Sequence, residues 1–205
     1  MPQEPSKLLQ LPSSTVIENI RDLWRLTKKP ANIYLVVDVS GSMEGEKLAG
    51  AKRAIYSFVS QIQGNRDQLA IIAFSTEFRL VEDLSVMSAE KRTRIQARVA
   101  SLNAGGGTLL YDAIKIAEDQ LKEKSNNDFT NVIVAMTDGQ SEGSISELEN
   151  AISSSELDLH IFTVAYGDDA DGTVLQSIAR LGNGYAYPSD PSTIDQLYEQ
   201  LSTFF

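Results

Sequence analysis

The stretch IYLVVDVSGSM at residues 33–43 decides the fold of this chain. Its first five residues form an apolar, β-rich run, and a polar turn begins at Asp38. Further β-rich runs recur along the chain, and most are separated by segments in which apolar residues have helical spacing. Strands that are apolar on both faces and alternate with helices are typical of a parallel sheet covered on both sides. The sequence therefore predicts a doubly wound, mostly parallel α/β sheet of six strands.

The expected strands are 33–38, 68–75, 77–83, 130–137, 159–166 and 184–187, and the expected helices are 46–63, 88–101, 109–124, 144–153, 172–181 and a last one from 191. Only Thr76 separates the second and third strands, so we expect the third to be an antiparallel partner at the sheet edge. In open α/β sheets, ligands bind at the carboxyl ends of the strands, near the point where the strand order reverses. Functional residues are therefore expected in the loops that follow the strands.

Composition excludes several classes of function. The chain has 205 residues, of which 42% are hydrophobic, and this suffices for one sizeable domain. Its net charge of -10 repels phosphate backbones and anionic lipids. Without cysteine it has no disulfide, thiolate metal site or cysteine nucleophile. No apolar run approaches the roughly 20 residues of a membrane-spanning helix. Nucleic acid and membrane insertion are therefore not expected.

The first part of the chain differs from the rest. We expect residues 1–30 to form an N-terminal arm with an amphipathic helix, and residues 31–205 to form the main domain. Apolar residues recur at helical spacing over 14–28, with Trp24 among them, and Pro30 follows. This helix either packs on the domain or joins it to an upstream domain. No basic start followed by a long apolar stretch is present, so no secretory signal is predicted.

Oxygen-bearing side chains lie at the expected ends of strands and starts of helices. The turn after the first strand carries a carboxylate and two hydroxyls at alternate positions, a Gly-Gly-Gly-Thr segment opens a later helix, and a Thr-Asp-Gly segment ends a later strand. Magnesium and similar hard cations prefer oxygen ligands in near-octahedral arrangement. The candidate ligands are Asp38, Ser40, Ser42, Thr108 and Asp138.

The charge of this set is as informative as its composition. If Asp38 and Asp138 are the only carboxylates, a divalent cation is formally neutralised and no further. A calcium site rich in carboxylates would instead satisfy its ion completely. The cation thus remains electrophilic toward one more anionic oxygen. We expect this ligand to be a Glu or Asp side chain of another protein, with water in its place when no partner is bound.

Three segments resemble the parts of the metal-ion-dependent adhesion site of von Willebrand factor type A domains: DVSGSM at 38–43, GGGTLLYDAI at 105–114 and VAMTDG at 134–139. The resemblance covers 31–205 and implies a Rossmann-like fold, a bound Mg²⁺, or Mn²⁺ or Ca²⁺, and adhesion to a protein ligand. It implies that the three hydroxyls bind the cation directly or through water, and that the two carboxylates act largely through bridging waters.

The same resemblance concerns the surrounding loops. We expect Gly41, Gly107, Asp112 and Gly139 to support the ligands, with Asp112 favouring the helix dipole or fixing a neighbouring loop. In the resembled family, shifts of the threonine-bearing loop and the last helix change the ligation of the cation. Residues 105–107 are the expected hinge here.

A second resemblance lies upstream. The segment LPSSTVIENIRDLWRLTKKPAN at 11–32 is similar to the helix before this module in bacterial proteins with an extracellular solute-binding-like domain. It implies an extracytoplasmic location, secreted, periplasmic or at the cell surface, within a larger protein. The alternative is a subunit of a motor-driven chelatase or cofactor-insertion complex in the cytosol. A metal-dependent hydrolase is disfavoured, because hydroxyls rather than a second carboxylate follow Asp38, and His160 is the only histidine. We expect no enzyme and no catalytic residues.

Other charged residues have simpler interpretations. The basic group Lys91, Arg92, Arg94 and Arg98 is interpreted as a solvated helix face. His160 is interpreted as a packing or edge residue. Asp168, Asp169 and Asp171 are interpreted as a charged loop between a strand and a helix, with an auxiliary calcium site as the alternative.

Overall fold

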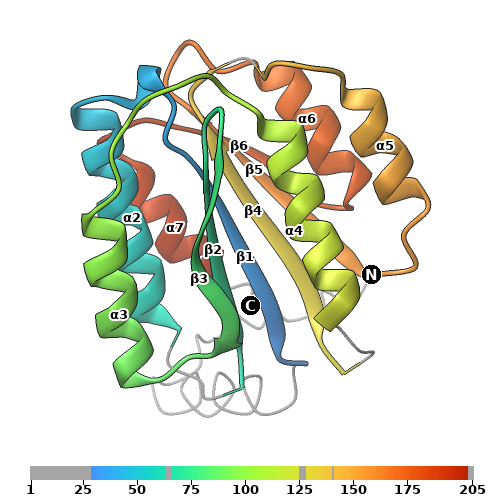
Figure 1. Cartoon of the computed structure of the whole chain (residues 1–205), viewed down its shortest axis with the longest axis horizontal. Coiled ribbons are helices and arrows are strands. Elements are labelled where there is room, and N and C mark those ends of the chain that lie inside the picture. Colours follow the sequence, from blue (N-terminus) through green and yellow to red (C-terminus); the bar gives the residue numbers. More distant parts are fainter. Residues whose placement is uncertain (1–28, 63–65, 125–127, 140, 203–205) are drawn as a thin grey trace, which may run out of the picture.

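The computed structural model describes residues 29–62, 66–124, 128–139 and 141–202. The strands are β1 (Ala31–Asp38), β2 (Gln68–Phe74), β3 (Phe78–Val86), β4 (Thr130–Thr137), β5 (Leu159–Tyr166) and β6 (Ala186–Ser189). They form one six-stranded sheet in the order β3-β2-β1-β4-β5-β6 (Figure 1). β3 is antiparallel to β2 at one edge, and the other neighbours are parallel. The predicted fold class and the antiparallel edge strand are confirmed.

Helices cover both faces of the sheet. They are the short η1 (Gly41–Met43), α2 (Glu46–Gln61), α3 (Ala89–Ala100), α4 (Leu110–Lys124), α5 (Ile145–Ser153), α6 (Gly172–Leu181) and α7 (Ile194–Ser202). α2, α3 and α7 lie on one face, and α4, α5 and α6 lie on the other (Figure 1). None of these helices combines the length and apolar character needed to cross a bilayer, within the residues described. The predicted amphipathic helix at 14–28 lies outside the described residues.

Two element boundaries near the C-terminus differ from prediction by two or three residues. The last strand begins at Ala186 because the residues before it form the C-terminal hydrogen bonds that end α6. Asn183 adopts a positive φ of 52°, and Gly184 N–H donates to the carbonyl of Ala179. α7 begins at Ile194 because the Asp190 side chain first accepts the N–H groups of Ser192 and Thr193 in a turn. Turn geometry of this kind leaves little trace in hydrophobic spacing.

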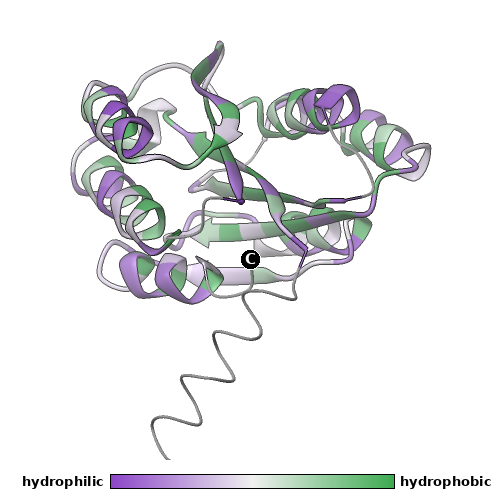
Figure 2. Cartoon of the chain, turned by 90° about the horizontal axis from the view of Figure 1, so that it is seen from below, coloured by the Kyte–Doolittle hydropathy of each residue, from purple (hydrophilic) through white to green (hydrophobic). Residues whose placement is uncertain are grey.

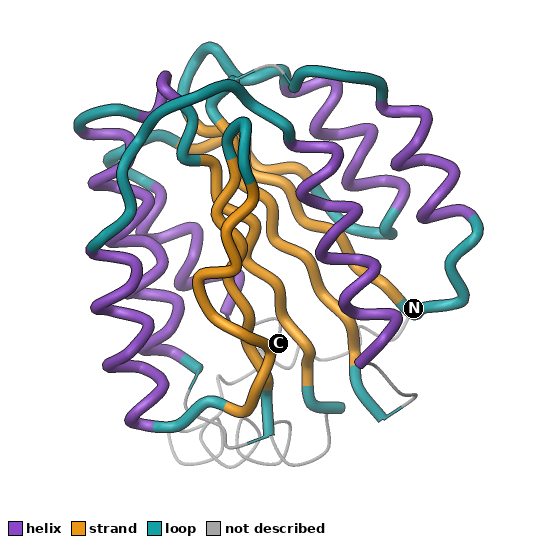
Figure 3. The backbone as a smooth tube through the Cα atoms, viewed as in Figure 1, coloured by secondary structure: helices purple, strands orange, loops and turns teal. Residues whose placement is uncertain are grey.

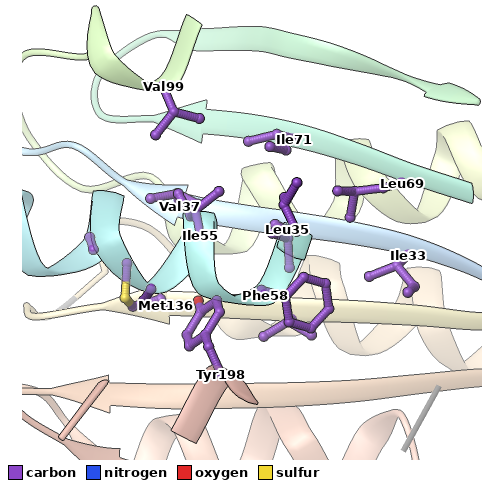
Figure 4. Packing of buried hydrophobic residues seen from close by; sticks show 14 of the residues in the cluster. Ile33, Leu35, Val37, Ile55, Phe58, Leu69, Ile71, Val99, Met136 and Tyr198 are labelled. Atoms are coloured by element: carbon purple, nitrogen blue, oxygen red, sulfur yellow. The ribbon is translucent and has the colours of Figure 1, made fainter. Parts of the chain in front are cut away.

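The core consists of two apolar layers on either side of the sheet. Every residue of β1 is buried, because alternate side chains enter opposite layers. Figure 4 shows one layer, in which Ile33, Leu35 and Val37 of β1 face α2. In that layer Phe58 and Tyr198 meet edge to face, with ring centroids 5.9 Å apart. Figure 2 shows hydrophobic strands between helices that carry both hydrophobic and hydrophilic residues, as the predicted two-sided cover requires.

The strand order reverses between β1 and β4. From β1 the sheet continues through β2 and β3 to one side, and from β4 it continues through β5 and β6 to the other. The loops that leave these two central strands therefore begin side by side at the carboxyl edge. Figure 3 shows loops gathered along this edge, at the top of the view. Open α/β sheets bind their ligands at such a reversal.

One basic residue of α3, Lys91, contradicts the interpretation as a solvated helix face. The Lys91 side chain is 1% exposed, and its ammonium donates to the backbone carbonyls of Leu69, Asp83 and Ser85. The β2–β3 pairing shifts register between Leu69 and Ile72, so its carbonyls need donors from outside the ladder.

Arg94 and Arg98 of α3 are exposed, as predicted, but they also form ion pairs with the edge strand. Their guanidinium groups lie 2.5 and 3.0 Å from the carboxylate of Glu82, which is buried in β3. Arg98 also donates to the carbonyl of Val81. These basic side chains therefore fasten α3 to the edge strand.

Two buried tyrosines predict a loss of stability in strong alkali. Burial raises the pKa of Tyr34 and of Tyr166 to about 12. An unfolded tyrosine has a pKa of about 10, so between about pH 10 and 12 the unfolded chain loses protons that the folded chain keeps. The free energy of unfolding therefore falls as pH rises through this window. Urea unfolding followed by circular dichroism should show a smaller loss for Tyr34→Phe than for the wild type. Tyr185, which is 69% exposed, offers the control Tyr185→Phe, which should behave like the wild type. If the free energy of unfolding falls equally in Tyr34→Phe and in the wild type, Tyr34 is not a source of this pH dependence.

Candidate metal centre

The two carboxylates of the candidate site come from the central strands. Asp38 is the last residue of β1, Asp138 directly follows β4, and both are fully buried. The Asp38 carboxylate accepts hydrogen bonds from the hydroxyl of Thr137 and, at 2.7 Å, from Ser40 N–H. The Thr137 bond joins the ends of β1 and β4 directly. The strand reversal thus brings the two predicted carboxylates close together at the carboxyl edge of the sheet.

The turn after β1 adds the two serine hydroxyls. Ser40 Oγ lies 3.1 Å from Ser42 Oγ, and Ser42 Oγ donates to Asp138 Oδ1 at 2.7 Å. The turn can make this approach because it continues into the short η1 helix, whose first residue, Gly41, donates its N–H to Gly106 O at 3.0 Å. The turn therefore contacts Asp38 through the backbone N–H of Ser40 and Asp138 through the hydroxyl of Ser42.

Thr108 comes to the same place from the glycine loop, residues 105–107. A Cβ atom on Gly139 would lie 3.7 Å from Thr108 Oγ1 and 3.9 Å from Ser42 Oγ, so both hydroxyls border this glycine. The backbone of Thr108 is held by Glu142 N–H, which donates to its carbonyl at 2.8 Å. All five predicted ligands therefore lie around one point at the carboxyl edge of the sheet.

The glycine loop is fastened on two sides. Gly105 N–H donates to Val39 O at 2.8 Å, and Leu109 N–H donates to Ser75 O at 3.1 Å. Gly106 has a φ of +86°, and a Cβ there would lie 2.7 Å from Thr76 Oγ1 of the β2–β3 turn. Glycine is needed at this position for both reasons. The expected hinge at 105–107 stays a prediction.

The remaining predicted residues lie around this centre. Gly107 lies against Glu142, since a Cβ on this glycine would overlap the Glu142 carboxylate. Asp112 lies in the first turn of α4 and lines a small polar pocket with Tyr111, Lys115 and Glu142. In the part of the chain that the structure describes, no hydrogen bond joins Asp112 to the five candidate ligands. Its expected supporting role stays a prediction.

Lys47 is a site residue that the sequence interpretation missed. Its ammonium lies 2.6 Å from Asp138 Oδ2 and 3.7 Å from Asp169 Oδ2. The hydrogen bond with Asp138 raises the pKa of Lys47. Lys47 stands in the first turn of α2, where a positive charge opposes the helix dipole. A lysine in that unfavourable position was the available signal of a nearby acidic partner.

The acidic loop beyond β5 has a structural use. Asp171 caps α6 by accepting the N–H groups of Thr173 and Val174 at 3.1 Å, and Asp169 faces Lys47. Across the described ranges, no three His, Cys, Asp or Glu side chains form a metal-binding group. The auxiliary calcium site therefore gains no support. His160 lies at the amino end of β5, opposite the candidate ligands, and its Nε2 is 3.7 Å from Asp158.

The electrostatics of the centre suit a hard cation. Burial raises the pKa of Asp38, the hydrogen bonds from Ser40 and Thr137 oppose this rise, and the charge of Asp138 adds to it. Lys47 contacts Asp138, but among the described residues no basic side chain forms an ion pair with Asp38. A buried carboxylate near a second one, with three hydroxyls beside them, fits a divalent cation that prefers oxygen ligands. Any such cation would depend on the hydroxyls, because the carboxylates are only two.

The fold agrees with comparisons to known proteins. Residues 32–200 match the family model of the von Willebrand factor type A domain. The chain belongs to this family. This VWA domain is 30% identical over 170 residues to inter-alpha-trypsin inhibitor heavy chain H4 of Homo sapiens, a match that covers 78% of this chain and 18% of that protein. The chain spans less than half of the length of the curated relatives it matches.

Solved structures share the fold of this VWA domain. A von Willebrand factor type A protein from Catenulispora acidiphila superposes with a TM-score of 0.77 and 22% identity, over 85% of this chain and 42% of that chain. The pilus adhesin SpaC from Lactobacillus rhamnosus GG, in its open conformation, has a TM-score of 0.73 and 15% identity, over 87% of this chain and 30% of that chain. VWA domains are commonly adhesion or protein-interaction modules.

Proposed function

We propose that this VWA domain is a metal-dependent protein-binding module rather than an enzyme. Asp38, Ser40, Ser42, Thr108 and Asp138 would hold a divalent cation, Mg²⁺ or else Mn²⁺ or Ca²⁺. The observation that carries the proposal is the convergence of two buried carboxylates and three hydroxyls at the strand reversal. When bound, the cation would supply an electrophilic centre for a Glu or Asp side chain of a partner.

The hydroxyl and carboxylate ligands would have different roles. The hydroxyls of Ser40, Ser42 and Thr108 offer neutral oxygens, so they bind without adding negative charge. The hydrogen bonds from Ser40 N–H and Thr137 Oγ1 orient the Asp38 carboxylate before any cation arrives. Because the ligand set carries only two negative charges, an anionic oxygen from outside would still be attracted.

The wider setting belongs to the same proposal. We place the domain in an extracytoplasmic protein, because the similar SpaC structure is named a pilus adhesin. Residues 1–30 would join it to an upstream domain of the solute-binding-like kind that segment 11–32 resembles.

Calorimetric titration with MgCl₂ tests the metal step. We expect saturable binding by the wild type and none by Asp138→Ala, because this substitution removes a buried ligand and leaves Lys47 without its closest partner. No binding by the wild type, or equal binding by both proteins, would overturn the proposed metal centre.

Selection of displayed random peptides in Mg²⁺ tests the recruitment step. Selected peptides should contain Asp or Glu, lose binding in EDTA, and lose binding when that residue becomes Asn or Gln. They should also bind Thr108→Ala weakly. Peptides that bind equally without Mg²⁺, or without their acidic residue, would contradict recruitment through the cation.

A further inference from the structure

We propose that Lys47 is a built-in competing cation that weakens metal binding to this VWA domain and leaves the loaded centre positively charged. The inference rests on the proposed metal centre and concerns a residue that is not one of its ligands. Lys47 Nζ lies 2.6 Å from Asp138 Oδ2, while the other oxygen of that carboxylate, Oδ1, accepts from Ser42. One buried carboxylate thus faces the candidate ligands with one oxygen and an ammonium group with the other.

The surrounding residues hold this lysine in place. The Lys47 carbonyl accepts a hydrogen bond from Tyr166 Oη at 3.0 Å, which ties the start of α2 to the end of β5. Gly167 follows with a φ of +88°, and a Cβ there would lie only 3.5 Å from Lys47 Cε. The lysine stem therefore lies along a glycine turn, with its side chain 26% exposed. Asp169, at 3.7 Å, is the second acidic group that faces the ammonium.

Charge arithmetic gives the consequence. The buried carboxylates of Asp38 and Asp138 contribute -2 and Lys47 contributes +1, so these three groups sum to -1 rather than -2. Asp169 is left out of this sum, because its side chain is 85% exposed and its charge is screened by solvent. A divalent cation then leaves the centre at +1 rather than neutral. The ammonium repels the cation and competes with it for Asp138, but it adds to the attraction for an anionic oxygen from a partner. Lys47 would therefore weaken binding of the metal and strengthen binding of the partner's acidic side chain to the loaded centre.

A purely structural salt bridge predicts the opposite sign. If Lys47 only positions Asp138, its removal leaves a misplaced carboxylate and weaker metal binding. If Lys47 competes, its removal strengthens metal binding, because the cation meets two uncompensated carboxylates. The direction of the change separates the two roles.

The experiment is calorimetric titration of the whole chain with MgCl₂ alone. We expect the Kd of Lys47→Met to be about tenfold lower than that of the wild type, since a unit charge within a few ångströms of an ion acts strongly even at an effective dielectric constant of about 20. Lys47→Arg keeps the charge and should restore nearly wild-type affinity. Lys124→Met removes the same charge from the exposed far end of α4 and should leave the Kd within about twofold.

Thermal unfolding supplies a readout without ligand. Metal-free Lys47→Met should melt below the wild type, because Asp138 loses its closest counter-charge, and Mg²⁺ should raise its melting temperature more than that of the wild type. Equal Kd values for Lys47→Met and the wild type, or a higher Kd for the variant, would overturn the inference and leave the metal centre standing. Absence of Mg²⁺ binding in both proteins would overturn the metal centre and the inference with it.

Discussion

Asp38→Asn should remove most of the rise in thermal stability that we expect Mg²⁺ to give the wild type, without lowering the stability of the metal-free form. The asparagine side chain would keep an oxygen for the N–H of Ser40 but would lack the negative charge that a cation requires. We expect Mg²⁺ affinity to fall by about 100-fold or more. At a concentration about 100 times the wild-type Kd, a 100-fold fall would remove about 2.3 of the roughly 2.7 kcal/mol of stabilisation that the cation would give the wild type.

The expected stability of the metal-free variant follows from the burial of Asp38. Because its pKa is raised in the folded state, the folded protein keeps a proton that the unfolded chain releases as pH rises above about 4. The carboxylate therefore lowers the stability of the metal-free protein at neutral pH. The uncharged amide of the Asp38→Asn variant does not lower the stability in this way.

Differential scanning fluorimetry measures the thermal stability of the metal-free protein in EDTA and of the protein with Mg²⁺ in MgCl₂. Asp119→Asn is a suitable control, because it removes one carboxylate from the exposed side of α4 and should behave like the wild type in both solutions. A variant Asp38→Asn that Mg²⁺ still stabilises would remove Asp38 from the proposed ligands. A marked loss of stability in EDTA would assign Asp38 a structural role instead.

Lys91→Met should destabilise the fold by about 3 kcal/mol at neutral pH. Its ammonium satisfies three backbone carbonyls and the Ser85 hydroxyl, all at the irregular β2–β3 pairing. Burial lowers the pKa of Lys91 only to about 8, so the group is still charged at pH 7. Methionine preserves much of the stem volume but donates no hydrogen bond. Each buried acceptor left unsatisfied costs about 1–3 kcal/mol.

Urea unfolding at pH 7 gives the free energy for Lys91→Met. Arg180→Met removes one positive charge from an exposed position on α6, on the other face of the sheet, and should cost only a few tenths of a kcal/mol. A cost below about 1 kcal/mol for Lys91→Met would mean that water, rather than lysine, satisfies these carbonyls. The edge strand would then hold its shape without the Lys91 ammonium.

The sequence was sufficient to predict those parts of the fold and of the candidate site that depend on local pattern. The apolar run of β1, the Asp-Ser-Ser turn and the Thr137-Asp138-Gly139 strand end each carry their own signal, and the rule for parallel sheets then places them at one edge. Convergence of Asp38 and Asp138 followed from topology alone. The bound cation itself remains a prediction.

The missed features depend on distant partners. Lys91 looks like a solvent-facing lysine because its own helix does not reveal the register shift in β2–β3 that surrounds it with carbonyls. Lys47 pairs with a carboxylate 91 positions away. Spacing within a helix indicates which side is apolar, but it does not reveal which polar group on another element needs a counter-charge. For that reason Lys91 was misinterpreted and Lys47 was missed.

The hydrogen bond between Thr137 and Asp38 also bears on when the centre forms. The two residues are 99 positions apart in sequence, so this contact exists only after β1 and β4 have paired in the middle of the sheet. Such distant pairings form late and slowly compared with local ones. A partly folded chain without this pairing has no place for a cation. Metal added during refolding would therefore slow unfolding of the finished domain rather than speed its assembly, and its uptake would report that the central strands are joined.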